Sequence, residues 1–127
     1  MKPDSTSLAL KADECLQVAR ELFAGGHYDF SAGRAYYAMF YLSEATLLER
    51  GKTFSSHHGV LAGFFHEFVE PELIDRSHHQ SLVRGFELRQ AGDYGGFASV
   101  SKEQCEDLLE RAARFFGAVR LMLEQSQ

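Results

Sequence analysis

The chain of 127 residues has 18 acidic and 13 basic side chains, and its formal net charge is −5 when the histidines are neutral. This length fits one domain, and a hydrophobic fraction of 45% excludes a chain that is disordered throughout. The negative charge also excludes a protein that binds nucleic acid through overall charge, so any contact with RNA or DNA must come from a local group of arginines.

The sequence predicts a cytoplasmic protein that does not enter the membrane. Its longest apolar run, residues 35–42, is far shorter than the roughly 20 residues that span a bilayer. The first eight residues lack the apolar segment of a signal peptide. Cys15 and Cys105 fall on the apolar faces of the first and last predicted helices, so we expect two buried thiols, as in a reducing compartment.

The first two predicted helices span residues 7–23 and 29–50. Apolar residues of the first recur every three or four positions, which places them on one helix face. The middle of the second, residues 35–42, is apolar or aromatic on every side. That stretch alone could be a buried strand, but its flanks extend a helical pattern far beyond strand length. A helix that is apolar all round must be covered on more than one side, and we expect Tyr37 and Tyr41 to meet a second copy of the chain.

Three more helices are predicted, over residues 56–69, over residues 77–92 and from Ser101 to about Leu123. Ser101 and Gln104 have the spacing of a capping box, which marks the start of the last helix. No segment alternates like a half-buried strand. Short connections between long amphipathic helices favour antiparallel neighbours. We therefore expect one all-α domain over residues 1–127, an up-and-down antiparallel bundle of four or five helices.

Three segments carry a more specific signal: residues 31–40 (SAGRAYYAMF), residues 56–60 (SHHGV) and residues 89–94 (RQAGDY). In this order and spacing they resemble the HEPN family, in particular its small stand-alone prokaryotic branch, over roughly residues 8–123. The resemblance implies a helical bundle and a homodimer. It also implies that the chain can be the partner of a small nucleotidyltransferase in a toxin–antitoxin pair, with a nucleotide or RNA among its ligands.

The alternative implied by the resemblance is a metal-independent RNase toxin, because several HEPN branches cleave RNA with an Arg-x4-6-His motif near the end of a helix. In this chain Asp93 and Tyr94 stand after Arg89 where that histidine would be. Two other arginine–histidine pairs have the spacing but cross a glycine break into a different segment. This departure favours a binding or accessory protein over an enzyme. If the chain is an enzyme, its catalytic candidates are Arg89, Asp93 and Tyr94.

The candidate residues for binding a nucleotide or phosphate are Arg34, His57 and Arg89. A guanidinium fork suits a phosphate, and His57 lies near a helix start, where backbone N–H groups point outward. Arg34 directly precedes the apolar stretch, so we expect it to be partly buried and to hold either Asp93 or an anion. Arg89 and Asp93 can also form a simple pair four residues apart on one helix. The histidine doublets do not chelate by themselves, and we expect neither a metal nor another cofactor.

Overall fold

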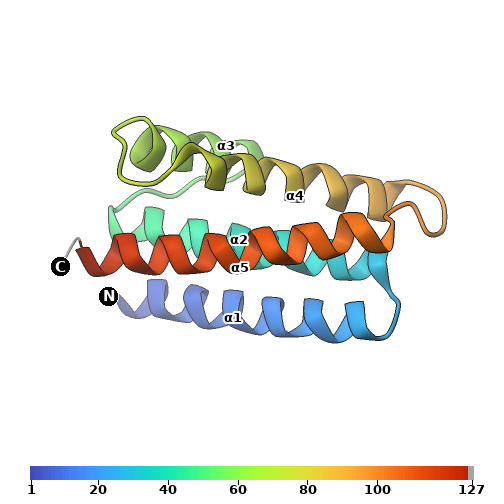
Figure 1. Ribbon diagram of the computed structural model, residues 1–127. Coiled ribbons are helices and arrows are strands. Elements are labelled where there is room, and N and C mark those ends of the chain that lie inside the picture. Colours follow the sequence, from blue (N-terminus) through green and yellow to red (C-terminus); the bar gives the residue numbers. More distant parts are fainter. Residues whose placement is uncertain (126–127) are drawn as a thin grey trace.

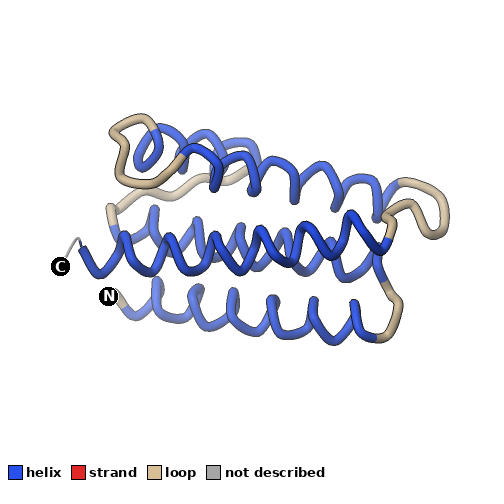
Figure 2. Tube along the Cα trace, viewed as in Figure 1, coloured by secondary structure: helices blue, strands red, loops and turns tan. Residues whose placement is uncertain are grey.

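The computed structural model describes residues 1–125, and within them it contains helices and loops but no strand (Figure 2). The elements are α1 (Pro3–Ala24), α2 (Tyr28–Glu49), α3 (His57–Phe64), the short π-helix η1 (Phe65–Val69), α4 (Arg76–Tyr94) and α5 (Lys102–Gln125). The four long helices lie side by side and run alternately in opposite directions (Figure 1). The prediction of an all-α antiparallel bundle is confirmed.

Side-chain caps fix three of the helix starts. Ser56 accepts a hydrogen bond from the backbone of Gly59, and Asp75 accepts one from the backbone of Ser77, both at 3.0 Å. The predicted capping box is present: the Ser101 hydroxyl accepts from the Gln104 backbone at 3.1 Å, and the Gln104 side chain accepts from the Ser101 backbone at 2.9 Å. The helix predicted over residues 56–69 differs from expectation in its last turn, which winds as the π-helix η1.

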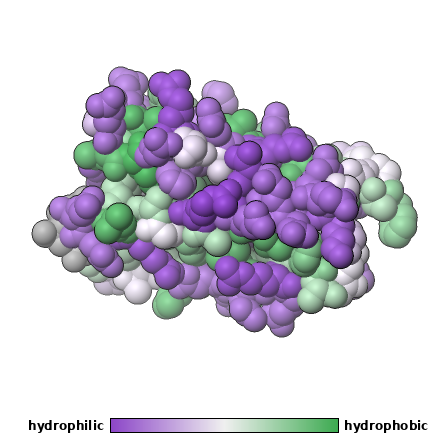
Figure 3. All heavy atoms as spheres, in the orientation of Figure 1, coloured by the Kyte–Doolittle hydropathy of each residue, from purple (hydrophilic) through white to green (hydrophobic). Residues whose placement is uncertain are grey.

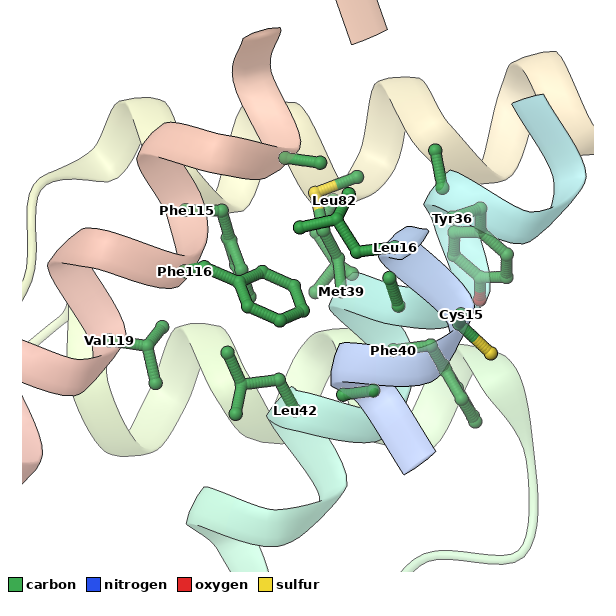
Figure 4. Close-up of a cluster of buried hydrophobic side chains, with 14 of the residues drawn as sticks. Cys15, Leu16, Tyr36, Met39, Phe40, Leu42, Leu82, Phe115, Phe116 and Val119 are labelled. Atoms are coloured by element: carbon green, nitrogen blue, oxygen red, sulfur yellow. The ribbon is translucent and has the colours of Figure 1, made fainter. Parts of the chain in front are cut away.

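The core forms around α2, which packs against α1, α3, α4 and α5. Tyr36, Met39 and Leu42 of α2 are buried and meet side chains from α1, α4 and α5 (Figure 4). Gly85 lets α4 approach α2, because a Cβ atom at this position would lie 2.9 Å from the Met39 methyl group and 3.2 Å from the Tyr36 ring. The bundle itself therefore covers most of the helix that the sequence marked as apolar all round.

One stripe of α2 remains partly exposed. It consists of Arg34, Tyr37, Tyr41, Glu44 and Leu48, while most of the residues between them are buried. Steps of three and four residues place these side chains on one helix face. We call this set the α2 stripe. It includes both tyrosines that we expect at a dimer interface, and that expectation stays a prediction.

Both cysteines are unpaired and buried, as predicted. Burial raises the pKa of each thiol, which keeps both in the protonated form at neutral pH. Across residues 1–125, none of the helices combines the length and hydropathy that a membrane span requires.

Candidate functional site

Residues from three helices meet around Tyr37 of the α2 stripe. The Cζ atoms of Arg34 and Arg89 lie 4.8 Å and 5.4 Å from the centre of the Tyr37 ring. The ring of His57, the first residue of α3, is centred 5.7 Å from the same ring and meets it edge-on. The fold thus brings together the three residues that the sequence indicated for phosphate binding. Arg34 comes from α2, His57 from α3 and Arg89 from α4.

Arg89 and Asp93 pair within α4. The Arg89 Nε atom lies 2.9 Å from the Asp93 carboxylate, and the Arg89 side chain is only 17% exposed. No acceptor lies in the direction of the Nε–H bond among the described residues, so this contact is an ion pair rather than a hydrogen bond. The arrangement matches the expected pair four residues apart on one helix.

Of the two partners expected for Arg34, an anion or Asp93, the structure contradicts Asp93. Asp93 pairs with Arg89, which lies one turn away on the same helix. This pair therefore requires no contact between helices. Arg34 is half-buried as expected, but it lies over the Tyr37 ring and beside the Cys15 thiol. Burial raises the pKa of that thiol, and the charge and hydrogen bond of Arg34 oppose the rise. No carboxylate forms an ion pair with Arg34 in the part of the chain that the structure describes.

His57 is enclosed by aromatic rings. Phe40 is the closest, with 4.5 Å between ring centres, followed by Tyr36 at 5.7 Å and Phe86 at 6.0 Å. Burial lowers the pKa of His57, and the positive charge of Arg89 acts in the same direction. The imidazole is therefore neutral at pH 7, and only one of its ring nitrogens carries a hydrogen.

The hydrogen bond between Tyr36 and His57 shows which ring nitrogen of His57 carries the hydrogen. The Tyr36 hydroxyl lies 2.7 Å from Nδ1 of His57 and has no other hydrogen-bond partner among residues 1–125. Tyr36 is fully buried, and burial raises the pKa of its phenol, so the hydroxyl keeps its hydrogen. A buried hydroxyl hydrogen without an acceptor is costly, so Tyr36 donates and Nδ1 accepts. The hydrogen of neutral His57 is then on Nε2, which makes this nitrogen a donor.

The other nominated residues lie at the margin of this cluster. Tyr94 is 75% exposed, with its ring centre 5.9 Å from the Arg89 guanidinium carbon. Tyr41 lies further along the α2 stripe, where the Lys11 ammonium group stands 4.6 Å from its ring centre. Tyr36 was missed as a site residue, because it lies in the apolar stretch 35–42, which the sequence indicated only as surface to be covered. Its partner His57 is 21 positions away, and no local pattern connects the two.

Comparison with known proteins gives the chain its family. A family model described as the HEPN domain matches residues 6–122, which include every residue of this cluster. The chain belongs to the HEPN family. The resemblance drawn from the three sequence segments is therefore confirmed.

Relatives of this HEPN chain occur in bacteria and archaea. A protein of Thermotoga maritima named "UPF0332 protein" is 36% identical over 90% of this chain and 86% of its own length. A protein of Gloeobacter violaceus, "UPF0332 protein glr0978", is 33% identical over 98% of this chain and its full length. A protein of Methanocaldococcus jannaschii named "Putative toxin MJ0605" is 28% identical over 90% of this chain and 84% of its own length.

The described part of this HEPN chain contains no group of three or more histidine, cysteine or acidic residues placed to hold a metal ion. The cluster offers hydrogen-bond donors rather than metal ligands. Two guanidinium groups and the Nε2–H of His57 can all donate hydrogen bonds to an anion, whereas the acceptor nitrogen of His57 is already occupied.

Proposed function

We propose that this HEPN protein is a dimeric binding or accessory protein that holds the phosphate of a nucleotide at Arg34, His57 and Arg89. In this proposal it works with a small nucleotidyltransferase in a toxin–antitoxin pair. One observation carries the binding role: His57, which meets the Tyr37 ring edge-on, is held by Tyr36 as a hydrogen-bond donor, next to two arginines.

The charges of the cluster support an anionic ligand. Arg89 is only partly neutralised by Asp93, whose side chain is 38% exposed, and Arg34 contacts a thiol and an aromatic ring rather than a carboxylate. Partial burial strengthens the field of both cations relative to water. Planar guanidinium groups bind phosphate oxygens through paired hydrogen bonds. The toxin–antitoxin setting is supported by the name of the Methanocaldococcus jannaschii relative, "Putative toxin MJ0605".

Calorimetric titration with AMP tests the binding role. The wild type should bind AMP, and Arg89→Gln should weaken binding at least tenfold, because it removes one charged donor but keeps a side chain of similar length. Arg84→Gln is the matched control, since Arg84 is also on α4 and forms a salt bridge with Glu87. The absence of AMP binding at millimolar concentration would show the proposal to be wrong. Co-purification of a nucleotidyltransferase with this protein tests the partner.

A metal-independent RNase is the second candidate, because His57 lies near Arg89, although the hydrogen bond from Tyr36 opposes a catalytic role for this histidine. His57 supplies a histidine near Arg89, which the sequence after Arg89 lacks. RNA cleavage needs a base for the 2′-hydroxyl and an acid for the leaving oxygen. Nδ1 of His57 accepts from Tyr36 and cannot act as that base, while Nε2–H of a neutral imidazole is a very weak acid. Asp93 beside Arg89 and the exposed Tyr94 do not supply a better pair.

Incubation of metal-free protein with a long single-stranded RNA separates the two candidates. We expect weak or no cleavage by the wild type. Cleavage that is lost in Arg89→Ala and in His57→Ala, but kept in Arg84→Ala, would make the RNase the better account.

A further inference from the structure

A hollow of about 400 Å³ lies at one end of the bundle, where the α1–α2 connection meets the α4–α5 connection (Figure 1). Three aromatic residues line it: Tyr28 and Phe30 from the first turn of α2, and Phe97 from the loop after α4. Asp29 and Asp93 contribute carboxylates to the same lining, which contains no lysine or arginine among the described residues. We call this hollow the end pocket.

Two phenyl rings of the end pocket are turned to solvent. Phe30 is 67% exposed and Phe97 is fully exposed. The loop that carries Phe97 extends beyond the bundle, and Figure 3 shows hydrophobic surface on this projection. A ligand that covers these rings removes apolar surface from water, which favours binding.

Aromatic rings elsewhere on the surface carry a cation from the chain itself. The Lys11 ammonium group lies 4.6 Å from the centre of the Tyr41 ring, and the Arg34 guanidinium carbon lies 4.8 Å from that of Tyr37. In residues 1–125, by contrast, no lysine or arginine lies over any of the three rings of the end pocket. The face of an aromatic ring attracts cations, and in the end pocket these faces are left to an external group.

The charge inside the end pocket is negative. Asp93 is partly neutralised by Arg89, which lies outside the lining. Asp29 forms no ion pair in the part of the chain that the structure describes. Its carboxylate accepts hydrogen bonds from the backbone N–H of Val100 at 2.8 Å and of Ser99 at 3.4 Å, and neither donor carries a net charge. A carboxylate has about four acceptor positions, so Asp29 keeps both its charge and the capacity to accept from a ligand.

The end pocket is preformed between two anchored connections. The hydrogen bonds to Asp29 hold the end of the loop that carries Phe97. Gly92 brings the end of α4 close to α2, because a Cβ atom there would lie 2.9 Å from the Asp29 carbonyl oxygen. Ala98 next to Phe97 has a φ of 59°, a conformation that a residue other than glycine keeps only where its surroundings impose it. A ligand therefore finds the aromatic walls already in place and pays little to order them.

We propose that the end pocket binds a small organic ammonium ion, with its alkyl groups against Phe30 and Phe97 and its charge facing Asp29. The rings attract such an ion through their π faces and through the apolar area that its alkyl groups cover. The carboxylate adds an opposite charge. An anion would be repelled by the carboxylates, and a metal ion would gain nothing from the apolar walls. This site uses neither Arg34 nor His57, so it does not depend on the proposed function.

Titration with choline and with 3,3-dimethylbutan-1-ol, which has the same shape but no charge, tests the proposal. The backbone N–H signals of Gly95 and Gly96, two residues of the lining, report binding by NMR. Work at about pH 8 limits protonation of His27, which also lines the pocket. Choline should bind in the millimolar range and about tenfold more tightly than the alcohol.

Two variants of Phe97 separate the aromatic face from apolar bulk and from net charge. Phe97→Leu keeps an apolar side chain and the charge of the protein but removes the ring, so it should lose most of the preference for choline. Phe97→Tyr keeps the ring and should keep the preference. Phe97 is fully exposed, so neither change should disturb folding.

Three results would overturn the proposal. Equal affinities for choline and the alcohol would show an apolar pocket that does not select a cation. A preference for choline that persists in Phe97→Leu would show attraction to an acidic protein in general rather than to the aromatic walls. No response to choline at millimolar concentration would exclude the cation site, and dissociation of a dimer in Phe97→Leu would then assign the end pocket to a second copy of the chain.

Discussion

The hydroxyl of Tyr36 donates a 2.7 Å hydrogen bond to Nδ1 of His57 and thereby fixes which ring nitrogen carries the hydrogen. We expect ¹⁵N chemical shifts of His57 in the wild type to be those of a neutral Nε2–H imidazole. Tyr36→Phe should produce a mixture of both tautomers and lower the free energy of unfolding by about 1–3 kcal/mol, because Nδ1 loses its partner. Tyr37→Phe is the control, and a wild-type Nδ1–H imidazole would contradict this assignment.

The stability of the fold should fall in mild acid. Burial lowers the pKa of His57, His78 and His79 below the ordinary value of 6.5. The unfolded chain therefore binds more protons, and the contribution of these groups is complete above about pH 6.5 and is lost as the pH falls towards their folded values. Chemical denaturation at about pH 7.5 and pH 5.5 measures the loss.

A pair of variants isolates the effect of one histidine. His79→Gln should lose less stability than the wild type between the two pH values, since it removes a half-buried titrating ring. His58→Gln should behave as the wild type, because His58 is exposed. The histidine account fails if the wild type is at least as stable at the lower pH and His79→Gln shows no difference from it.

Replacement of two helical glycines, Gly92 and Gly117, by alanine should change the free energy of unfolding in opposite directions. Gly92→Ala places a Cβ atom 2.9 Å from the carbonyl oxygen of Asp29, a backbone atom that cannot move cheaply, so the free energy of unfolding should drop by about 1–3 kcal/mol. Beyond the adjoining turns of α5, no described atom lies within 4 Å of a Cβ atom at Gly117, so Gly117→Ala should add about 0.5–1 kcal/mol. Thermal denaturation of both variants provides the test, and equal shifts would show that the two helices do not pack as described.

The α2 stripe should form the interface of a homodimer. Sedimentation at tens of micromolar should show a dimer for the wild type. Tyr41→Glu should produce a monomer, because it places a second carboxylate three residues from Glu44 on the same helix face and removes an aromatic ring from the stripe. Leu121→Glu, an equally polar change on α5, should stay dimeric. A wild type that sediments as a monomer at this concentration would contradict the proposed homodimer.

Features that depend on neighbours in sequence could be predicted. The capping box of Ser101 and Gln104 and the pair of Arg89 and Asp93 both arise within one helical turn, so spacing alone indicates them. The family resemblance likewise rests on short segments. The apolar periodicity of α1 and α5 was enough to predict the bundle, because each long helix must bury its apolar face against the others.

Features that depend on packing could not be predicted. Tyr36 and His57 meet only because α3 lies over α2, and the sequence gives no register for that contact. The α1–α2 and α4–α5 connections are joined by a hydrogen bond from the Val100 backbone to the Asp29 carboxylate, and these two residues are 71 positions apart. Asp93, one of the two partners predicted for Arg34, was wrong for a related reason: Asp93 finds a cation on its own helix, and Arg34 contacts a thiol and an aromatic ring.

The central claim is that Arg34, His57 and Arg89 together bind a phosphate group, with His57 as a donor. The most direct test follows the Nε2–H signal of His57 by NMR while inorganic phosphate is added. We expect this signal to shift and to saturate in the wild type and in Arg84→Gln, and to stay unchanged in Arg89→Gln. A wild-type signal that does not respond to phosphate, or that responds equally in Arg89→Gln, would contradict the account.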